Sequence, residues 1–406
     1  MPGPTSAAPP LAHASARPSL AALHAAASRV GQILVFGALP LGLTLLIFRS
    51  YSGLGILHFD FEGTVWEPTH AILDGRSPFP DPSERGVDVG NPAVYPPSVA
   101  LVGLPFAALP FAVAAALWTA VSLAAVAVSL WLLGSRDWRC HMLVLSSFPV
   151  LLAATMGNVT LLLIAAVAVT WVYRDRPAIA GVALGLAVAL KLFLWPLVLW
   201  LLATKRFRAG AISIASGTAA IFVPWAAIGF AGLRDYPDLL RAADHVFSEH
   251  SNSLYAGAAG LGLGDVAARS VALAVGAALV LGCFALARRP AGDFRSLCAA
   301  LGAALVLTPI AWPHYFALLF VPVAILRPQL HRLWLVAPIS SAIFLLLPLP
   351  RGTSAGRPAD VPAAVWEPLH ASSPAIWHTL GYTALLAVVL TVALRRIALW
   401  RREQTA

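Results

Sequence analysis

Residues 178–203 read AIAGVALGLAVALKLFLWPLVLWLLA, an apolar stretch that contains one charged residue, Lys191. Fourteen uncharged residues precede this lysine and 13 follow it. About 20 apolar residues are enough for a helix to cross a bilayer, so the stretch is typical of a membrane protein. Because Lys191 and Pro196 interrupt it, we expect a hairpin of two short spans rather than one straight helix.

The rest of the chain has the same character. Of its 406 residues, 59% are hydrophobic and 11% are charged, whereas about 25% of the residues of a soluble domain are charged. These proportions exclude a soluble globular fold, and the alternating segments of about ten residues that mark outer-membrane barrels are absent. We therefore predict an all-α polytopic membrane protein.

The apolar runs predict about 12 transmembrane helices. Residues 98–134 carry no charge, and Pro105 and Pro110 predict a half-inserted helix before a full span at 111–133. A second hairpin is expected where Pro309 and Pro313 interrupt the run 296–326. The other runs lie near 30–48, 140–155, 158–173, 209–229, 266–287, 333–348 and 375–394.

The distribution of charge supports a topology with both termini in the cytoplasm. In that arrangement the inner segments hold 18 of the 27 basic residues but 4 of the 18 acidic ones, which is the bias expected of cytoplasmic loops in a plasma-membrane protein. The predicted organisation is a single multi-span domain at 29–400 between a disordered cytoplasmic tail, 1–28, and a cytoplasmic tail, 401–406. Two long loops, 49–96 and 230–256, lie outside.

Several common functions are excluded. The net charge of +9 is dispersed along the chain and follows the predicted membrane side, so we expect no nucleic-acid partner. The three cysteines form no CxxC pair, and no metal or cofactor site is evident. Walker A, GxGxxG, HExxH and GxSxG elements are also absent, which disfavours ATP-driven pumps and hydrolases of the standard kinds.

Three ionisable residues are candidates for chemistry on the outer side. Asp60 lies between two phenylalanines, where desolvation would suit a general base; the alternative is a solvated loop acid. Lys191 is costly in an apolar run and suits a phosphate, unless it is an anchor that reaches the membrane surface. His314, between Pro313 and Tyr315, is either a site residue or an interfacial histidine.

Four further residues are candidates for substrate binding. Tyr95 begins the rigid Tyr95-Pro96-Pro97 entry into a helix, where an interfacial aromatic is the alternative. Asn158 opens a helix, so it could equally cap that helix. His250 and Asn252 end the loop 230–256.

Taken together, these stretches resemble the polyprenyl-phosphate-mannose-dependent α-mannosyltransferases of actinobacterial envelopes, which belong to the GT-C superfamily. The resemblance covers about residues 60–315. It is carried by motifs in a particular order: Asp60 with LDGRSPF at 73–79, Tyr95-Pro96-Pro97, Gly157-Asn158-Val159-Thr160, Ala180-Gly181 and Gly185 before Lys191, Asn252-Ser253-Leu254, and Pro309 followed by Trp312-Pro313-His314-Tyr315.

The resemblance implies a GT-C-type fold with a long first extracytoplasmic loop that carries the catalytic aspartate, Asp60 here. It implies that Asp60 removes the proton from an acceptor hydroxyl, which attacks the sugar with inversion and displaces polyprenyl phosphate. Lys191 and His314 are our candidates for stabilising that phosphate. The partners would be a polyprenyl-phosphate sugar and a lipid or glycan acceptor, within the lipid bilayer.

The chain departs from the pattern of this family at three positions. The family usually has Gln where Asn158 stands, Tyr at the position of Thr64 or Val65, and Pro at the position of Leu192. Two other functions stay open from the sequence. One is a lipid or solute transporter or flippase, which many spans and Pro-broken helices also suit. The other is a pentosyl transferase of the same superfamily, for example an arabinofuranosyl transferase.

Overall fold

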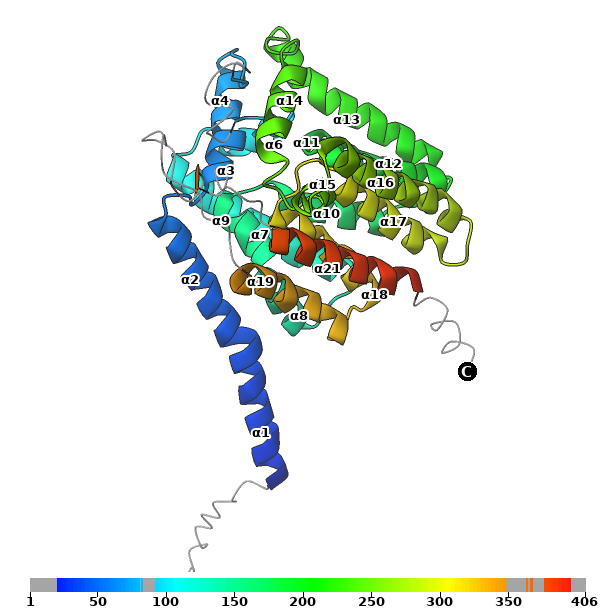
Figure 1. Cartoon of the computed structure of the whole chain (residues 1–406). Coiled ribbons are helices and arrows are strands. Elements are labelled where there is room, and N and C mark those ends of the chain that lie inside the picture. Colours follow the sequence, from blue (N-terminus) through cyan, green and yellow to red (C-terminus); the bar gives the residue numbers. More distant parts are fainter. Residues whose placement is uncertain are drawn as a thin grey trace, which may run out of the picture.

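The computed structural model describes residues 20–80, 82, 92–347, 363, 366–367 and 376–395. Within these ranges the chain folds into helices joined by short connections and contains no strand (Figure 1). The all-α prediction is confirmed for this part of the chain.

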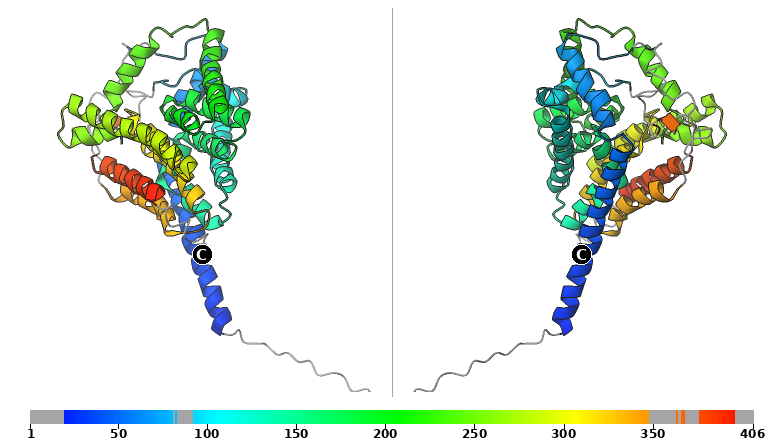
Figure 2. Two further views of the ribbon diagram at one scale, coloured as in Figure 1. Left: turned by 90° about the vertical axis from the view of Figure 1, so that its right-hand side faces the viewer. Right: turned by 90° about the vertical axis from the view of Figure 1, so that its left-hand side faces the viewer.

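The N-terminal helices form one long rod. It consists of α1 (Leu20–Ile33), η1 (Leu34–Ala38) and α2 (Leu39–Gly53), and both views in Figure 2 show α1 extending away from the other helices. Apolar side chains such as Leu45 and Leu46 are about 60% exposed on it, which suits contact with lipid tails. The helix begins inside the predicted disordered tail 1–28; residues 1–19 lie outside the described ranges.

The predicted outer loop 49–96 is partly helical. It contains α3 (Phe59–Phe61), η2 (Glu62–Trp66) and α4 (Glu67–Leu73). Two short helices, α6 (Val99–Gly103) and η3 (Leu104–Phe106), lie where a half-inserted helix was expected, and the full-length helix α7 (Phe111–Leu132) follows them. The prolines thus break the uncharged stretch where predicted.

Both predicted hairpins are broken where expected. The first has α11 (Pro177–Leu190), η4 (Leu192–Leu194) and α12 (Pro196–Ala203), with Lys191 at the break. The second has α17 (Gly292–Leu307), η5 (Pro313–Leu319) and α18 (Phe320–Leu326). The remaining elements are α8 (Trp138–Leu145), α9 (Phe148–Met156), α10 (Thr160–Val172), α13 (Phe207–Ala227), α14 (Tyr236–Phe247), α15 (Leu254–Gly260), α16 (Asp265–Ala287), η6 (Arg332–Leu335), α19 (Val336–Leu346) and α21 (Ile376–Arg395).

The structure supports a multi-pass membrane protein but not the predicted number of about 12 spans. Among the described residues, five helical stretches are long and apolar enough to cross a bilayer: Ala27–Gly53, Phe111–Leu132, Phe207–Ala227, Asp265–Ala287 and Ile376–Leu394. A sixth arises if α8 and α9, bent by 58°, count together. Other apolar helices are shorter; α10, with 13 residues, is about 20 Å long, less than the ~30 Å hydrocarbon core.

The helices α10, α11 and α17 run between an end of the molecule that is rich in arginine and an end that carries the predicted site residues. At the arginine-rich end, Asp293 of α17 forms two ion pairs. One is with Arg174, which follows α10, at 3.2 Å, and the other is with Arg206, which follows α12, at 2.7 Å. The Arg206 guanidinium, bonded to the carboxylate, holds the pKa of Asp293 below its ordinary value despite burial. At their other ends α10 and α11 meet Asn158 and Lys191. The basic end and the polar residues predicted for the site are therefore separated by the length of these helices.

Small residues allow α11 and α13 to pack closely. A Cβ added to Gly185 would lie 2.5 Å from the backbone oxygen of Ser213 and 2.9 Å from the backbone nitrogen of Gly217. Membrane helices commonly approach each other through such small residues. This contact fixes α11, and with it the break at Lys191, against the following helix.

Candidate active site

All seven predicted site residues line one cavity of about 480 Å³. They come from segments far apart in the sequence: Asp60, Tyr95, Asn158, Lys191, His250, Asn252 and His314. A cavity of this size can hold a sugar phosphate together with part of an acceptor, because small-molecule sites have volumes of about 300–1,000 Å³. The structure thus brings together every residue that the sequence proposed.

Asp60 is placed by a close contact between α3 and the break after α9. Gly157, with φ of +72°, ends α9, and a Cβ added to it would lie 2.5 Å from the Cβ of Phe61. The backbone N–H of His58 donates to the Thr155 carbonyl at 2.6 Å, and Trp118 Nε1 donates to the Gly157 carbonyl at 2.8 Å. Only glycine fits both this φ and this contact, so α3 is fixed directly against Asn158.

Asn158 connects the other polar groups. Its Nδ2 donates to Asp60 Oδ2 at 2.6 Å and to the Tyr95 hydroxyl at 3.1 Å. Its Oδ1 accepts from Lys191 Nζ at 3.0 Å, and from the hydroxyl and the backbone N–H of Thr160 at 2.7 and 3.0 Å. The contact with Thr160 N–H is the helix-terminal bond that the sequence suggested, so Asn158 caps α10 and organises the site at once.

Lys191 lines the cavity as a buried side chain and does not reach the surface. It is 3% exposed, and Nζ donates to Asn158 Oδ1 and to Thr160 Oγ1, the latter at 3.2 Å. Nζ also lies 4.1 Å from the ring centroid of Tyr315 and 5.1 Å from that of Tyr95. Aromatic faces attract a cation, so the lysine head is held in place by two polar groups and two rings.

The segment that carries Tyr95 is attached to α11 and α14. Ser98 Oγ donates to the Ala189 carbonyl, two residues before Lys191. The hydroxyl of Tyr236, on α14, donates to the Val94 carbonyl at 2.8 Å. The Pro96-Pro97 pair is buried between these contacts. Tyr95 is therefore fixed at the cavity wall, and its hydroxyl accepts a hydrogen bond from Asn158.

His314 faces the cavity from the second hairpin. It is 4% exposed, and neither ring nitrogen has a hydrogen-bond partner within the described part of the chain. Its ring meets that of Tyr315 edge-on at 4.9 Å, and Tyr315 stacks on Phe193 at 4.8 Å. A buried imidazole without partners is costly unless a ligand satisfies it, which fits a residue that contacts substrate.

Asn252 is held by contacts to two other segments, whereas Nδ1 of the nearby His250 has no hydrogen-bond partner among the described residues. The Asn252 backbone N–H donates to the Ala311 carbonyl, and its side-chain Nδ2 donates to Thr379 Oγ1 at 3.4 Å. Ser251 Oγ donates to the Pro309 carbonyl at 3.3 Å. The loop that ends the predicted outer segment 230–256 is thereby joined to the tip of the second hairpin and to α21.

Sequence reasoning missed several residues of this cavity. Tyr51, Thr64, Thr308, Tyr315 and His378 also line it. His378 is 2% exposed and lies near the start of α21. An ionisable residue in an apolar run was a usable signal for it, whereas nothing in the sequence distinguishes Thr64 or Tyr51 from ordinary loop and helix residues.

The loop beside Asp60 contains two other groups whose protonation is altered by their surroundings. Burial lowers the pKa of His58. Burial also raises the pKa of Glu67, and the neighbouring Glu62 carboxylate adds to that increase. No group of three His, Cys, Asp or Glu side chains lies together among the described residues.

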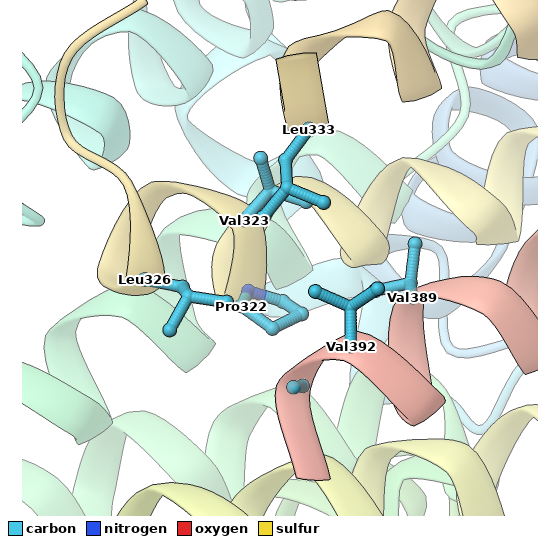
Figure 3. A pocket seen from close by; sticks show the side chains of 7 residues that line it. Pro322, Val323, Leu326, Leu333, Val389 and Val392 are labelled. Carbon is cyan, nitrogen blue, oxygen red and sulfur yellow. The ribbon is translucent and has the colours of Figure 1, made fainter. Parts of the chain in front are cut away.

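A second, much smaller crevice lies between α18, η6 and α21 (Figure 3). Its volume is about 10 Å³, and apolar side chains line it, among them Pro322, Val389 and Val392. That space is about the size of one water probe. It offers no polar group for chemistry, so the large cavity is the candidate active site.

The apolar helices and this cavity define a multi-pass membrane protein with a polar pocket among its helices. The sequence pattern of glycosyltransferase family 87 matches residues 93–313, more than half of the chain, and the chain belongs to this family. The match includes Tyr95, Asn158, Lys191, His250 and Asn252. Asp60 precedes the matched segment and His314 directly follows it, but both line the same cavity as the matched residues.

The chain is also similar to a curated protein of Mycolicibacterium smegmatis. That protein is a polyprenol-phosphate-mannose-dependent alpha-(1-2)-phosphatidylinositol pentamannoside mannosyltransferase, and the two are 28% identical over 249 residues. The aligned region covers 58% of this chain and 60% of the relative. No solved structure matches the chain.

Proposed function

We propose that this protein transfers a mannosyl group from polyprenyl-phosphate-mannose to a hydroxyl of a lipid-linked or glycan acceptor. The observation that carries the proposal is the convergence of Asp60, Lys191 and His314 on one cavity. The carboxylate can act as a base for the acceptor hydroxyl. The ammonium and the imidazole can stabilise the phosphate, by charge and by a hydrogen bond. The name of the mycobacterial relative supports the choice of sugar and carrier.

In the proposed reaction Asp60 is the general base. The acceptor O–H gives its proton to the Asp60 carboxylate while its oxygen forms a bond to the anomeric carbon of mannose. The bond from that carbon to the phosphate oxygen breaks, and its electron pair leaves with polyprenyl phosphate. Attack from the face opposite the phosphate inverts the anomeric configuration, so a β-linked donor gives an α-linked product.

Lys191 and His314 stabilise the departing phosphate in this proposal. Phosphate leaves as an anion and needs no proton, so the site has to balance its charge. The Lys191 ammonium is a compact point charge suited to this task. The partnerless ring nitrogens of His314 can supply a donor to a phosphate oxygen. One base is therefore enough, and a second catalytic carboxylate is not required.

We further propose that the cavity opens to the extracytoplasmic side of the plasma membrane, in a GT-C-type arrangement. The arginines around Asp293 form the cytoplasmic end by the positive-inside rule, and the cavity lies at the opposite ends of α10 and α11. In this arrangement the short apolar helices end at the cavity, within the depth of the bilayer, so crossings outnumber the five long helices. A lipid-linked donor then enters from the outer leaflet.

Purified protein in lipid vesicles, supplied with polyprenyl-phosphate-[¹⁴C]mannose and phosphatidylinositol mannosides, tests the proposal. We expect a labelled product whose new linkage is α by glycosidase digestion and NMR. Protein with Asp60→Asn, prepared in parallel, should form this product at least about 100-fold more slowly. Transfer from polyprenyl-phosphate-arabinose instead would assign the pentosyl alternative, and movement of labelled donor across the vesicle without any product would assign the flippase alternative.

A further inference from the structure

The carboxamide of Asn158 lies between the two groups to which the proposed function gives the chemistry. It bonds Asp60 Oδ2 at 2.6 Å through Nδ2 and Lys191 Nζ at 3.0 Å through Oδ1. We propose that Asn158 is a positioning residue that fixes the base and the phosphate-binding cation relative to each other and makes no contact of its own with substrate. This inference rests on the proposed function and replaces the substrate-binding role that the sequence suggested for Asn158.

Saturation of the carboxamide excludes a direct bond to substrate. The NH₂ group has two hydrogens to donate, and Asp60 and Tyr95 accept them. The oxygen has two lone pairs, and Lys191 together with the hydroxyl and the backbone N–H of Thr160 already occupies them. Asn158 is also 1% exposed. A substrate hydroxyl could bond it only by displacing one of these partners.

The chemistry of the partners fixes the orientation of the amide. An ammonium group has donors and no acceptor, so Lys191 must face the carboxamide oxygen. The NH₂ group is then forced toward Asp60, whose carboxylate accepts. A 180° rotation would place NH₂ against the ammonium and an oxygen against the carboxylate. Thr160 secures the same orientation from the helix backbone, so the carboxylate always receives a donor and the lysine always donates.

A donor at Asp60 favours the charged form of the carboxylate, which is the form that can act as a base. Asp60 also acts electrostatically on Lys191, Tyr51, Tyr95 and Tyr315, and His314 faces the same cavity. Among these, Lys191 is the group whose positive charge favours the carboxylate. By bonding both, Asn158 holds the cation near enough to support the base while its head points to the donor phosphate.

Asn158→Asp tests this role because it keeps the size of the side chain and replaces the NH₂ group, a donor, with a carboxylate oxygen, an acceptor. A second carboxylate beside Asp60 disfavours the charged form of the base. The acid limb of the pH profile of kcat/KM should therefore move to higher pH, by about one unit or more, and kcat at neutral pH should fall. Asn158→Gln keeps the amide, so the acid limb of kcat/KM should stay at the wild-type pH. Its kcat should still fall, because the longer side chain displaces Asp60 and Lys191. If Asn158 only supported the fold, both variants would have a lower kcat and neither would show a shifted acid limb.

A binding measurement separates this inference from the proposed function. The affinity for polyprenyl phosphate alone, followed by intrinsic tryptophan fluorescence in vesicles, should fall about tenfold in Asn158→Asp, because the new carboxylate pairs with Lys191. An unchanged pH limb with unchanged affinity in a folded Asn158→Asp protein overturns the inference and leaves the proposed function standing. If the wild type transfers no sugar at all, the proposed function fails, and the inference is then decided by affinity: unequal affinities support it and equal ones overturn it.

Discussion

At the scale of single residues, Asp60 and Lys191 carry the proposed reaction, and they differ in how clearly the sequence marks them. Lys191 stands alone in an apolar run, whereas Asp60 is one of seven acids in its loop. Their environments in the fold are shared, since the same carboxamide bonds both. Substitutions at the two positions should nevertheless give different kinetic signatures.

Asp60→Asn should lower kcat about 10²- to 10⁴-fold, the usual contribution of a general base, while donor KM stays within a few-fold. The amide cannot accept the proton but preserves the size of the side chain. Steady-state kinetics with labelled donor measures this. Glu62→Gln, two residues away on an exposed side chain, is the matched control and should retain activity. Equal losses in both variants would contradict the assignment.

Lys191→Met should raise the KM for the lipid-linked donor about 10- to 100-fold, the effect of losing one hydrogen bond to a charged group. The KM for the acceptor should change much less, because the acceptor contacts the base. Lys205→Met is the control, since Lys205 is exposed and lies at the basic end of the molecule. Parallel changes in both KM values would argue against a phosphate-binding role.

At the scale of elements, the site depends on helices that end early. α9 and α11 each terminate at the cavity, with Gly157 and Lys191 at their C-terminal ends. Because the backbone leaves the helix there, the side chains of Asn158 and Lys191 point into the cavity rather than along a helix surface. The breaks thus place both side chains at the cavity wall, and long uninterrupted spans are a minority of the described helices.

Gly157→Ala should lower kcat strongly while the protein stays folded. An added Cβ would press on Phe61, on the short helix that carries Asp60, and the positive φ costs a further ~1–2 kcal/mol. Gly229→Ala provides the matched control, because Gly229 also has a positive φ, +60°, but no atom lies within 4 Å of its added Cβ. Both variants should melt at a lower temperature than the wild type, Gly157→Ala somewhat more than Gly229→Ala, and kcat should be lost in Gly157→Ala alone. Equal kcat in both variants would show that α3 does not depend on this contact.

At the scale of the whole molecule, two ends with different chemistry are separated by the helices between them. The ion pairs of Asp293 with Arg174 and Arg206 join the ends of α10, α12 and α17. The cavity lies at the opposite ends of α10 and α11. Loss of the ion pairs should therefore affect stability and leave the chemistry of the site unchanged.

Asp293→Asn should lower the melting temperature in detergent by roughly 1 °C at pH 7, the effect of about 1 kcal/mol in a chain of this size. Because the pKa of Asp293 is lowered in the folded protein, its contribution is present above the unfolded pKa and is lost as pH falls through the folded value. The difference from wild type should thus begin to shrink below about pH 4 and vanish at still lower pH. Asp175→Asn, which affects the exposed partner of Arg206, should have a smaller effect, and a pH-independent difference would contradict this account.

The sequence by itself determined the class of protein, the helix breaks and the set of candidate residues. Apolar runs and prolines act locally, because each span must satisfy its own backbone in lipid and each proline removes a donor. For this reason the breaks at Pro105, Lys191 and Pro309 were predicted correctly. The predicted number of about 12 spans is not supported by the helix lengths. Helix length depends on where the cavity interrupts a helix, and this is a property of packing.

Only the tertiary structure decided which polar residues act together. The hydrogen bond between Asn158 and Asp60 joins residues 98 positions apart, and that between Lys191 and Asn158 joins residues 33 apart. Local sequence cannot distinguish a helix cap from a bridge between two charged groups, because both need the same amide at the same helix start. Burial of the surrounding helices is what places the partners on either side of Asn158, and it also brings His378 of α21 to the cavity wall.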